Sequence, residues 1–193
     1  PPLRTSVTVE KPRTIIARNQ SPDIAFDRSV NPYRGCEHGC IYCFARPSHA
    51  YHDLSPGLDF ETKLFAKPDA PALLREELGK RGYVCQPIAF GTNTDPYQRA
   101  EGRYRLMPWI IGALADTETP FSILTKGTLL RRDLPLLRQA AGQVAVSIGI
   151  SLAFFDADLQ KQIEPGTPSP QARLSLIRDI ADAGFAPHVM VAP

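Results

Sequence analysis

Short apolar segments alternate with helical patterns along most of this chain, and this alternation constrains the fold more than any other feature. The apolar segments fall near residues 28–33, 86–92, 121–125, 144–151 and 187–192, and the helical patterns cover 69–80, 103–116, 134–141 and 170–184. Strands separated by whole helices cannot pair as hairpins, so the order predicts parallel β–α–β units. A continuous apolar run such as 144–150 suits a strand that helices cover. The sequence therefore predicts the α/β fold class.

Capping residues predict where several helices begin and end. Asp69 and Asp133 stand directly before two of the helical patterns and are candidate N-caps. Ser169 followed by Pro170 is typical of an N-cap with proline at the first helical position. Gly184 is a candidate C-terminal stop for the same helix.

The chain divides into a lead-in and a core. Residues 1–27 are polar and rich in proline, and we interpret them as an N-terminal arm with little core of its own. Residues 28–193 carry the alternating pattern and form the predicted core domain. Within it, residues 60–67 alternate with a period of two, which predicts an additional strand before the first helix. The chain opens at Pro1 and closes on a strand-like run, so we expect a piece of a longer protein.

Composition excludes several classes of protein. The 193 residues are 43% hydrophobic and 22% charged, as in globular proteins and unlike disordered or fibrous ones. No run of about 18 apolar residues occurs, so we expect no membrane span, and we find no signal for secretion. The net charge of +2 is too small to indicate nucleic-acid binding by itself. Four cysteines in a chain of this length do not make a disulfide scaffold.

Three of the four cysteines lie close together, directly after the first predicted strand. Cys36, Cys40 and Cys43 have the spacing C-x3-C-x2-C, and Gly35 and Gly39 allow the loop backbone angles that other residues resist. Three neighbouring thiols cannot all pair as disulfides. A tight loop can instead bend three thiolates toward one point, which suits an iron–sulfur cluster with one iron left open.

A zinc site is the alternative that the same thiols allow. A closed Cys3His site would add His38, His49 or His52, and such sites are ordinary structural zinc centres. The remaining thiol, Cys85, precedes the second predicted strand and so lies at the opposite end of the sheet. We expect Cys85 to be a packed residue.

Polar side chains follow the predicted strands where each strand ends. Because chemistry in α/β folds gathers at the carboxyl ends of parallel strands, these residues form the predicted ligand site. They are Asn93, Thr94, Asp95, Lys126, Ser151, Glu164 and Arg173. Glu164 and Arg173 flank a proline-rich loop, where they would clamp a polar ligand or form a structural salt bridge. An Asx turn at 93–95, a solvated Lys126 and a buried Ser151 are the alternatives for the others.

The cysteine spacing, with Tyr42 just before the third cysteine, resembles the radical S-adenosylmethionine (radical SAM) superfamily. The resemblance implies a partial six-stranded (β/α) barrel, here truncated after its fifth strand. It also implies a [4Fe–4S] cluster held by Cys36, Cys40 and Cys43, whose fourth iron binds S-adenosylmethionine. One electron then cleaves this cofactor to a 5′-deoxyadenosyl radical, which abstracts hydrogen from a substrate. Tyr42 matches the family's aromatic residue against the adenine.

The resemblance assigns the polar residues to S-adenosylmethionine. The family's polar motif after the second strand, often Gly-Gly-Glu, meets the amino group; it is absent here, and residues 93–95 stand in its place. From their places at the strand ends alone, Ser151 is a candidate for a ribose hydroxyl and Lys126 for a carboxylate or phosphate. For Glu164 with Arg173 the resemblance implies contacts to the ribose and the methionine carboxylate. A reductant protein such as flavodoxin or ferredoxin is implied. Because such a cluster needs a reducing compartment, we expect a cytoplasmic protein.

Three segments, 31–36, 92–97 and 164–170, resemble the branch that contains spore photoproduct lyase and DNA-repair-photolyase-like bacterial proteins. That lyase splits a cross-linked thymine dimer, so the resemblance implies DNA with a damaged pyrimidine as substrate. A set of arginines would rim the same face and contact phosphates, or be solvated: Arg99, Arg103, Arg105, Arg131 and Arg132. A radical SAM enzyme with a non-DNA substrate and a zinc-stabilised nucleic-acid-binding module stay open as alternatives.

Overall fold

The computed structural model describes residues 4–192, whose larger β-sheet has the strand order β2–β3–β6–β7–β8–β9. Its strands are β2 (Ile16–Arg18), β3 (Arg28–Val30), β6 (Ile88–Phe90), β7 (Phe121–Thr125), β8 (Val146–Ser151) and β9 (His188–Met190). Neighbours from β3 to β9 are parallel, and β2 is antiparallel to β3. The predicted α/β class and its five core strands are therefore confirmed.

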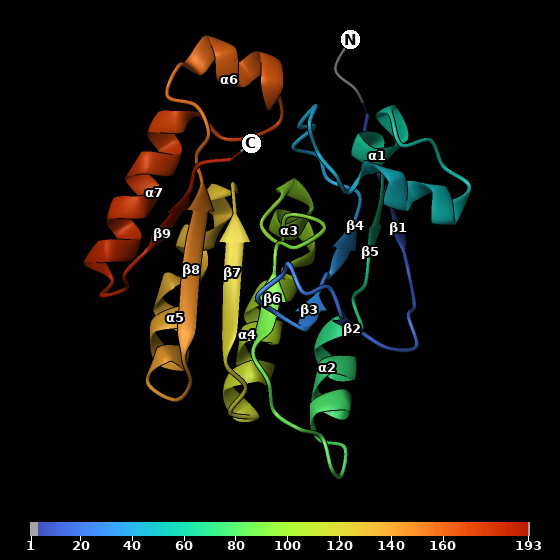
Figure 1. Ribbon diagram of the computed structural model, residues 1–193, viewed down its shortest axis with the longest axis vertical. Helices are drawn as coiled ribbons and strands as arrows, with labels where there is room; N and C mark the ends of the chain where they lie inside the picture. The colour runs from blue at the N-terminus through green and yellow to red at the C-terminus, as the bar shows by residue number, and fades with distance from the viewer. Residues whose placement is uncertain (1–3, 193) are drawn as a thin grey trace.

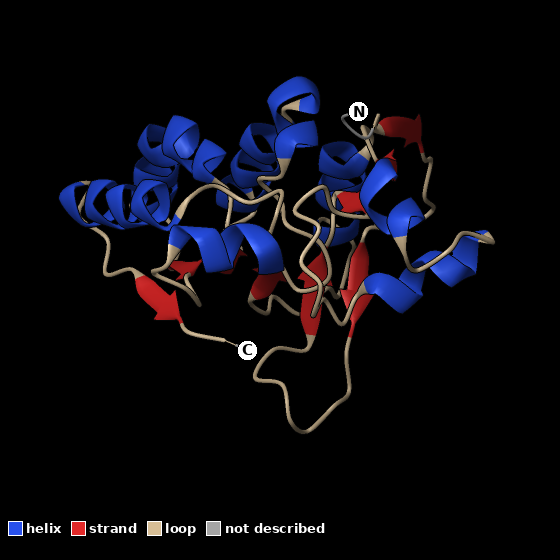
Figure 2. Ribbon diagram, turned by 90° about the horizontal axis from the view of Figure 1, so that it is seen from above, coloured by secondary structure: helices blue, strands red, loops and turns tan. Residues whose placement is uncertain are grey.

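Helices connect the parallel strands and lie mainly along one face of the arc that the strands form (Figure 2). The α-helices are α1 (Leu58–Thr62), α2 (Ala70–Leu78), α3 (Arg99–Tyr104), α4 (Leu106–Asp116), α5 (Leu134–Ala141), α6 (Ala157–Ile163) and α7 (Pro170–Asp182). Two 3-10 helices, η1 (Arg46–His52) and η2 (Thr128–Asp133), complete the set in the described residues. The sequence patterns did not reveal α6.

The core lies between these helices and the sheet. Phe121 and Ile123 of β7, Ile148 of β8, and Ile110 and Leu114 of α4 are almost fully buried in one cluster. Burying an apolar side chain of this size stabilises the folded chain by about 1.5–3 kcal/mol. Packing against the helices therefore fixes the carboxyl edge of the sheet as a rigid frame for whatever binds there.

The helix predicted over residues 103–116 is present as α4, but its predicted start is wrong, because the chain breaks at Arg105. This residue has φ 51° in the left-handed region and separates α3 from α4. The buried carboxylate of Glu101 accepts the backbone N–H groups of Leu106 at 3.0 Å and Met107 at 3.2 Å. Glu101 thus caps the second helix from inside the first, which a helical period cannot reveal.

The predicted caps are confirmed in part. Ser169 precedes Pro170, and its hydroxyl accepts the N–H of Ala172 at 3.2 Å. Asp69 and Asp133 stand at the predicted N-cap positions, directly before α2 and α5, but neither side chain makes a capping hydrogen bond.

The lead-in has more structure than expected. A smaller sheet, of order β1–β5–β4, joins β1 (Ser6–Val9), β5 (Lys63–Ala66) and β4 (Tyr33–Arg34). The strand predicted within 60–67 is therefore present as β5, whereas residues 60–62 complete α1. The lead-in supplies β1 and β2, although Ile15 is its one residue in the buried apolar core of the described chain. The domain boundary at 27/28 stays a prediction.

Strands β7 and β8 point toward the end of the molecule that carries the cysteine loop and α6 (Figure 1). Cys85 lies away from that end, next to Glu118 and Thr119 before β7. Its placement is as predicted, but the expectation of a packed thiol is wrong, because Cys85 is exposed. Among the described residues, no helix is both long and apolar enough to cross a membrane.

Candidate metal and cofactor site

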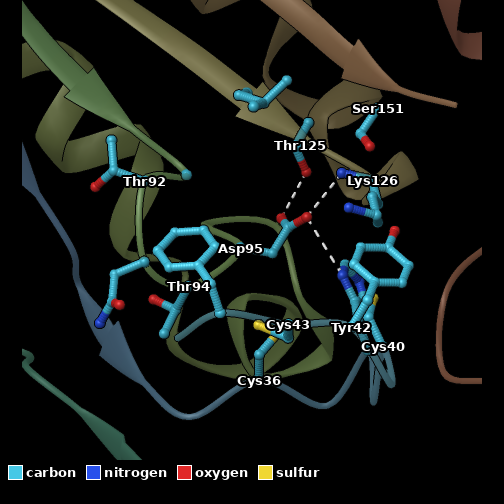
Figure 3. A pocket seen from close by; sticks show the side chains of 15 residues that line it. Cys36, Cys40, Tyr42, Cys43, Thr92, Thr94, Asp95, Thr125, Lys126 and Ser151 are labelled. Atoms are coloured by element: carbon cyan, nitrogen blue, oxygen red, sulfur yellow. Dashed lines mark hydrogen bonds and ion pairs between the residues drawn. The ribbon is translucent and has the colours of Figure 1, made fainter. Parts of the chain in front are cut away.

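A cavity with about 610 Å³ of empty space, its open mouth included, lies at the carboxyl edge of the larger sheet (Figure 3). The cysteine loop forms one wall through Cys36, Cys40 and Cys43, together with His38, Tyr42 and Phe44. The last residues of β7 and β8 and the segments that follow β6 and β7 form the other: Gly91, Thr92, Asn93, Thr94, Asp95, Leu124, Thr125, Lys126 and Ser151. The structure thus gathers most of the predicted site residues in one place.

Backbone and side-chain hydrogen bonds hold the first half of the cysteine loop. Cys36 donates its N–H to the carbonyl of Phe60 at 2.9 Å. The buried amide of Gln98 donates to the carbonyl of Gly35 and accepts the N–H of Glu37, both at 3.0 Å. Gly35 has φ 72°, and a Cβ there would lie 2.7 Å from the Phe60 carbonyl oxygen. Only glycine fits this position without displacing the loop.

The loop between α6 and α7 holds the second half. Ile41 donates its N–H to the carbonyl of Ile163 at 3.0 Å, and Gly166 donates its N–H to the carbonyl of His38 at 2.9 Å. A Cβ on Gly166 would come within 2.0 Å of the Glu37 carbonyl oxygen. The two loops therefore pack backbone against backbone, so the cysteines depend on a segment about 125 residues further along the chain.

The three thiols are a donor set for a soft metal or an iron–sulfur cluster. Burial raises the pKa of Cys40 to about 12 and also raises the pKa of Cys43, so without a metal both stay protonated at neutral pH. A bound metal would displace these protons. Between residues 4 and 192, no group of three or more His, Cys, Asp or Glu side chains forms a ready site for one metal ion. The thiols, from one loop and on one wall of an open cavity, fit a cluster that needs space for an added ligand.

Asp95 connects the loops around the cavity. One carboxylate oxygen accepts the N–H of Tyr97 at 2.8 Å and the hydroxyl of Thr125 at 2.5 Å. The other accepts the N–H of Lys126 at 2.7 Å and faces Nδ1 of His38 at 3.3 Å (Figure 3). Burial alone would raise the pKa of Asp95, but His38 and the hydrogen bonds hold it at about 2. Since all four acceptor positions are used, Asp95 positions its neighbours rather than a ligand.

Thr94 and Asn93 differ in whether their side chains already make a hydrogen bond within the chain. The buried Thr94 hydroxyl donates to the carbonyl of Tyr33 at 3.0 Å. Asn31 accepts the N–H groups of Asn93 at 3.2 Å and Thr94 at 3.4 Å through its side-chain oxygen. The side chain of Asn93 makes no hydrogen bond to another described residue and lies at the cavity surface. Of the three predicted stand-ins, Asn93 is thus the one with an unused polar side chain.

Tyr42, Lys126 and Ser151 line the cavity as predicted. The Tyr42 hydroxyl donates to Glu164, and the Lys126 ammonium lies 5.7 Å from the centre of the Tyr42 ring and 3.9 Å from the Glu164 carboxylate. Burial and the hydrogen bond to Glu164 raise the pKa of Tyr42. Lys126 is thus held between an aromatic face and a carboxylate, with its charge at the cavity wall.

Glu164 and Arg173 lie behind the cavity and do not line it. Both are fully buried and form an ion pair of 2.6 Å. Arg173 also donates to the carbonyls of Ser151 and Pro168 and to the hydroxyl of Thr167, each at 3.0 Å. The structure therefore shows the structural salt bridge, with neither side chain at the cavity surface, and a direct contact of these two residues with a ligand stays a prediction.

The zinc alternative finds little support in the histidines. His38 is the one candidate that lines the cavity with the thiols. The Nε2 atom of His49 is hydrogen-bonded to the carbonyl of Lys63 at 2.8 Å, and the ring of His52 stacks on that of Phe65 with ring centres 4.5 Å apart. Neither lines the cavity.

The predicted arginine rim separates into two groups. Arg131 pairs with Asp179, and Arg132 pairs with Glu101 and Asp133, so these two are not free for phosphate contacts. The remaining three are exposed around α3: Arg99, Arg103 and Arg105.

Several residues that build the site were not predicted from the sequence. Asn31 follows β3 and Thr125 ends β7, so the rule that polar residues at carboxyl ends form the site could have found them. Glu37 and Gln98 had no such signal, because Glu37 accepts the N–H of Ala100 at 2.8 Å across a contact that only the fold creates.

Solved structures of spore photoproduct lyase share this fold. The enzyme complexed with dinucleoside spore photoproduct matches with a TM-score of 0.68 at 18% sequence identity, over 97% of this chain and 51% of that one. A variant of the same enzyme, with bound AdoMet and dinucleoside spore photoproduct, also matches with a TM-score of 0.68 at 18% identity and the same coverage.

Curated relatives extend across domains of life. An uncharacterized protein of Mycobacterium tuberculosis (strain H37Rv) is 58% identical over 180 residues, which are 92% of this chain and 53% of the relative. An uncharacterized protein of Methanocaldococcus jannaschii is 24% identical over 164 residues, 85% of this chain and 59% of the relative. The chain thus spans about half the length of the relatives it matches. The family model described as "Radical SAM superfamily" matches residues 30–192. With the cysteine loop and the parallel sheet, this match shows that the chain belongs to the radical SAM superfamily.

Proposed function

We propose that Cys36, Cys40 and Cys43 hold a [4Fe–4S] cluster and that the adjoining cavity binds S-adenosylmethionine. The observation that carries this proposal is the placement of three thiols on one wall of a cavity whose other wall is the polar carboxyl edge of β6, β7 and β8. Membership of the superfamily and the AdoMet-bound structure of spore photoproduct lyase support it.

When bound, the cluster and S-adenosylmethionine supply a 5′-deoxyadenosyl radical for hydrogen abstraction. This chain's residues bind and orient the cofactor. The unused amide of Asn93 is suited to the amino group, the Lys126 ammonium to the carboxylate, and the Ser151 hydroxyl to the ribose. The Tyr42 ring is fixed by its bond to Glu164 and offers a face for the adenine. Glu164 and Arg173 act behind the wall by holding Tyr42 and the Ser151 carbonyl in place.

We further propose a lyase-like repair reaction on DNA that carries a damaged pyrimidine. The fold shared with spore photoproduct lyase, solved with its dinucleoside photoproduct, supports this substrate class. Arg99 and Arg103 on α3 and Arg105 directly after it are exposed and supply positive charge for phosphates. Electrons would come from a reductant protein such as flavodoxin or ferredoxin, in a reducing compartment such as the cytoplasm. A different substrate with the same radical chemistry is the competing proposal.

Product analysis tests both levels of the proposal. The reconstituted protein, reduced under anaerobic conditions with S-adenosylmethionine, should form 5′-deoxyadenosine, and Cys36→Ala, Cys40→Ala and Cys43→Ala should abolish it. Cys85→Ala is the matched control, because this thiol is exposed and lies away from the cavity. No 5′-deoxyadenosine from the wild type would reject the radical SAM activity. If the product forms but ultraviolet-irradiated DNA is not repaired, the DNA substrate is rejected and the radical chemistry stands.

A further inference from the structure

A second cavity adjoins the first and is lined mainly by polar groups. It offers about 850 Å³ of empty space, its open mouth included. Its walls come from β2 and the residues just before it, from β3 and β4, and from the residues that follow β3, β5 and β6. The lining residues are Thr14, Ile15, Ile16, Ala17, Ser29, Asn31, Tyr33, Arg34, Lys67, Thr92 and Asn93. Thr92 and Asn93 line both cavities, so an occupant of the second lies next to an occupant of the first.

Lys67 is a buried cation that lacks a carboxylate partner. The residue is 7% exposed, and its ammonium donates one hydrogen bond, to the carbonyl of Asn31 at 2.9 Å. Among residues 4–192, no Asp or Glu lies within ion-pair distance of it. An ammonium has three donors, and a buried charge is costly unless it is paired. Burial, and secondarily Arg34, lower the pKa of Lys67 to about 8, so it is still charged at pH 7.

Arg34 adds a second positive charge on the same wall. Its Nε donates to the carboxylate of Glu10 at 2.8 Å, which leaves the two terminal nitrogens without a partner in the described part of the chain. Glu10 pairs with Arg34 and acts on Lys67 only from a greater distance, so one negative charge stands against two positive ones and the wall keeps a net positive charge. The same positive charge acts on His52: burial lowers the pKa of this imidazole most, and the charge of Arg34 lowers it further.

We propose that Lys67 and Arg34 form an oxyanion subsite that holds a phosphate or carboxylate group of the substrate beside the cofactor cavity. That this oxyanion belongs to a substrate rests on the proposed function, because the subsite adjoins the space assigned to the cofactor. An oxyanion would provide the missing acceptors for the Lys67 ammonium and match the free fork of Arg34. Its binding would offset the cost of the buried charge, which gives the site a physical reason to exist.

Ligand-induced stabilisation tests the subsite with simple probes. The thermal midpoint of the reconstituted protein is measured at pH 7 with increasing inorganic phosphate, acetate or the dinucleotide thymidylyl-(3′→5′)-thymidine. We expect a saturable rise in the wild type and an affinity at least about tenfold weaker in Lys67→Met, since a charged hydrogen bond is lost. Lys63→Met is the matched control: it lies at the start of the same strand, β5, but its exposed ammonium pairs with Asp59. That variant should respond like the wild type.

The three probes separate the sources of the oxyanion. Saturation by phosphate and the dinucleotide, but not by acetate, identifies a phosphate-bearing substrate, whereas preference for acetate identifies a carboxylate. An equal response of Lys67→Met and the wild type overturns the subsite, as does the lack of a saturable response of the wild type to all three probes. We expect Lys67→Met to stay folded, because replacing a buried unpaired charge with an apolar side chain preserves or increases stability. A weaker response of this variant therefore reports weaker binding.

Binding of S-adenosylmethionine by the wild type is measured separately in the same preparation. If the oxyanions bind through Lys67 but S-adenosylmethionine does not bind, the subsite stands and the proposed function fails. If S-adenosylmethionine binds and the oxyanion response is independent of Lys67, the subsite alone fails.

Discussion

The carboxylate of Asp95 accepts the backbone N–H of Lys126 at 2.7 Å, and this contact joins the segments that follow β6 and β7. The same carboxylate faces His38 at 3.3 Å, between two of the three cysteines. One buried side chain therefore couples the cysteine loop to two strands of the sheet. The polar wall of the cavity and the thiol wall are held as a unit.

Replacing Asp95 with Asn should destabilise the chain by about 2–3 kcal/mol, because the amide places donors against groups that already donate. Denaturant unfolding measures this loss. Asp116→Asn is the control, since its pair with Arg75 is exposed and should contribute less than about 1 kcal/mol. Equal effects of the two substitutions would contradict the role assigned to Asp95.

Asp95 also predicts an acid-dependent loss of stability. Its pKa is about 2 in the folded chain against 3.8 for the free group, so the unfolded chain binds the proton first as the pH falls. Its contribution, about 2 kcal/mol, is fully present above pH 4 and lost as the pH falls toward 2. The stability difference between wild type and Asp95→Asn should therefore shrink over this range. A constant difference between pH 6 and pH 2.5 would count against the depressed pKa.

Removal of Arg173 takes away the 2.6 Å ion pair of the buried Glu164 carboxylate and leaves the Lys126 ammonium, 3.9 Å away, as its remaining cation. Arg173→Met should cost about 3–5 kcal/mol of folding free energy, with the free energy of unfolding as the measurement. Arg131→Met, which breaks the exposed pair with Asp179, should cost less than about 1 kcal/mol. Similar losses from both variants would show that the Glu164–Arg173 pair does not anchor the Tyr42 wall.

Gly166 is expected to control the cysteine loop from a distance. A Cβ there would lie 2.0 Å from the Glu37 carbonyl, so Gly166→Ala must push the two loops apart. We predict a loss of about 1–3 kcal/mol and a lower iron content after reconstitution. Gly102→Ala, in a helix with its nearest neighbour atom at 3.8 Å, should be neutral or stabilising by up to about 1 kcal/mol and retain iron. A normal iron content of reconstituted Gly166→Ala would contradict the claim that this loop contact controls the metal site.

Lys67 predicts that stability rises with pH in the alkaline range, the same direction that Asp95 gives at acid pH. Its pKa is about 8 when folded against 10.5 when free, so between these values the unfolded chain holds a proton that the folded chain does not. Stability from this group therefore rises with pH across the window. Relative to Lys67→Met, the wild type should gain about 3 kcal/mol between pH 7.5 and 10.5, where Arg34, Glu10 and His52 are the neighbouring charged or titratable groups. Parallel pH profiles of the two proteins would rule out a buried ammonium.

Much of the fold was predictable because its signals are local. Strand β7 and helix α5 have the predicted bounds, since apolar period and breaker residues define them within a few positions. The α3–α4 break was not predictable, because Arg105 depends on the carboxylate of Glu101, which Tyr33 and Arg132 hold from other parts of the chain. Strand β1 was missed for a similar reason: its pairing partner, β5, begins 57 residues after it.

The site shows the same division. The carboxyl-end rule correctly gathered Asn93, Asp95, Lys126 and Ser151 around one cavity. It could not tell which of them have unused polar atoms. That Asp95 is saturated and Asn93 is not depends on contacts from the cysteine loop and from the segments after β6 and at the end of β7, and no spacing along the chain encodes them.

The central claim, a three-cysteine cluster with an iron open to S-adenosylmethionine, is tested most directly by electron spin resonance. The protein is reconstituted with iron and sulfide without oxygen, reduced, and measured before and after S-adenosylmethionine is added. We predict about four irons per chain and a cluster signal that changes when the cofactor binds. Stoichiometric zinc without iron, or a cluster signal that S-adenosylmethionine leaves unchanged, would contradict the account.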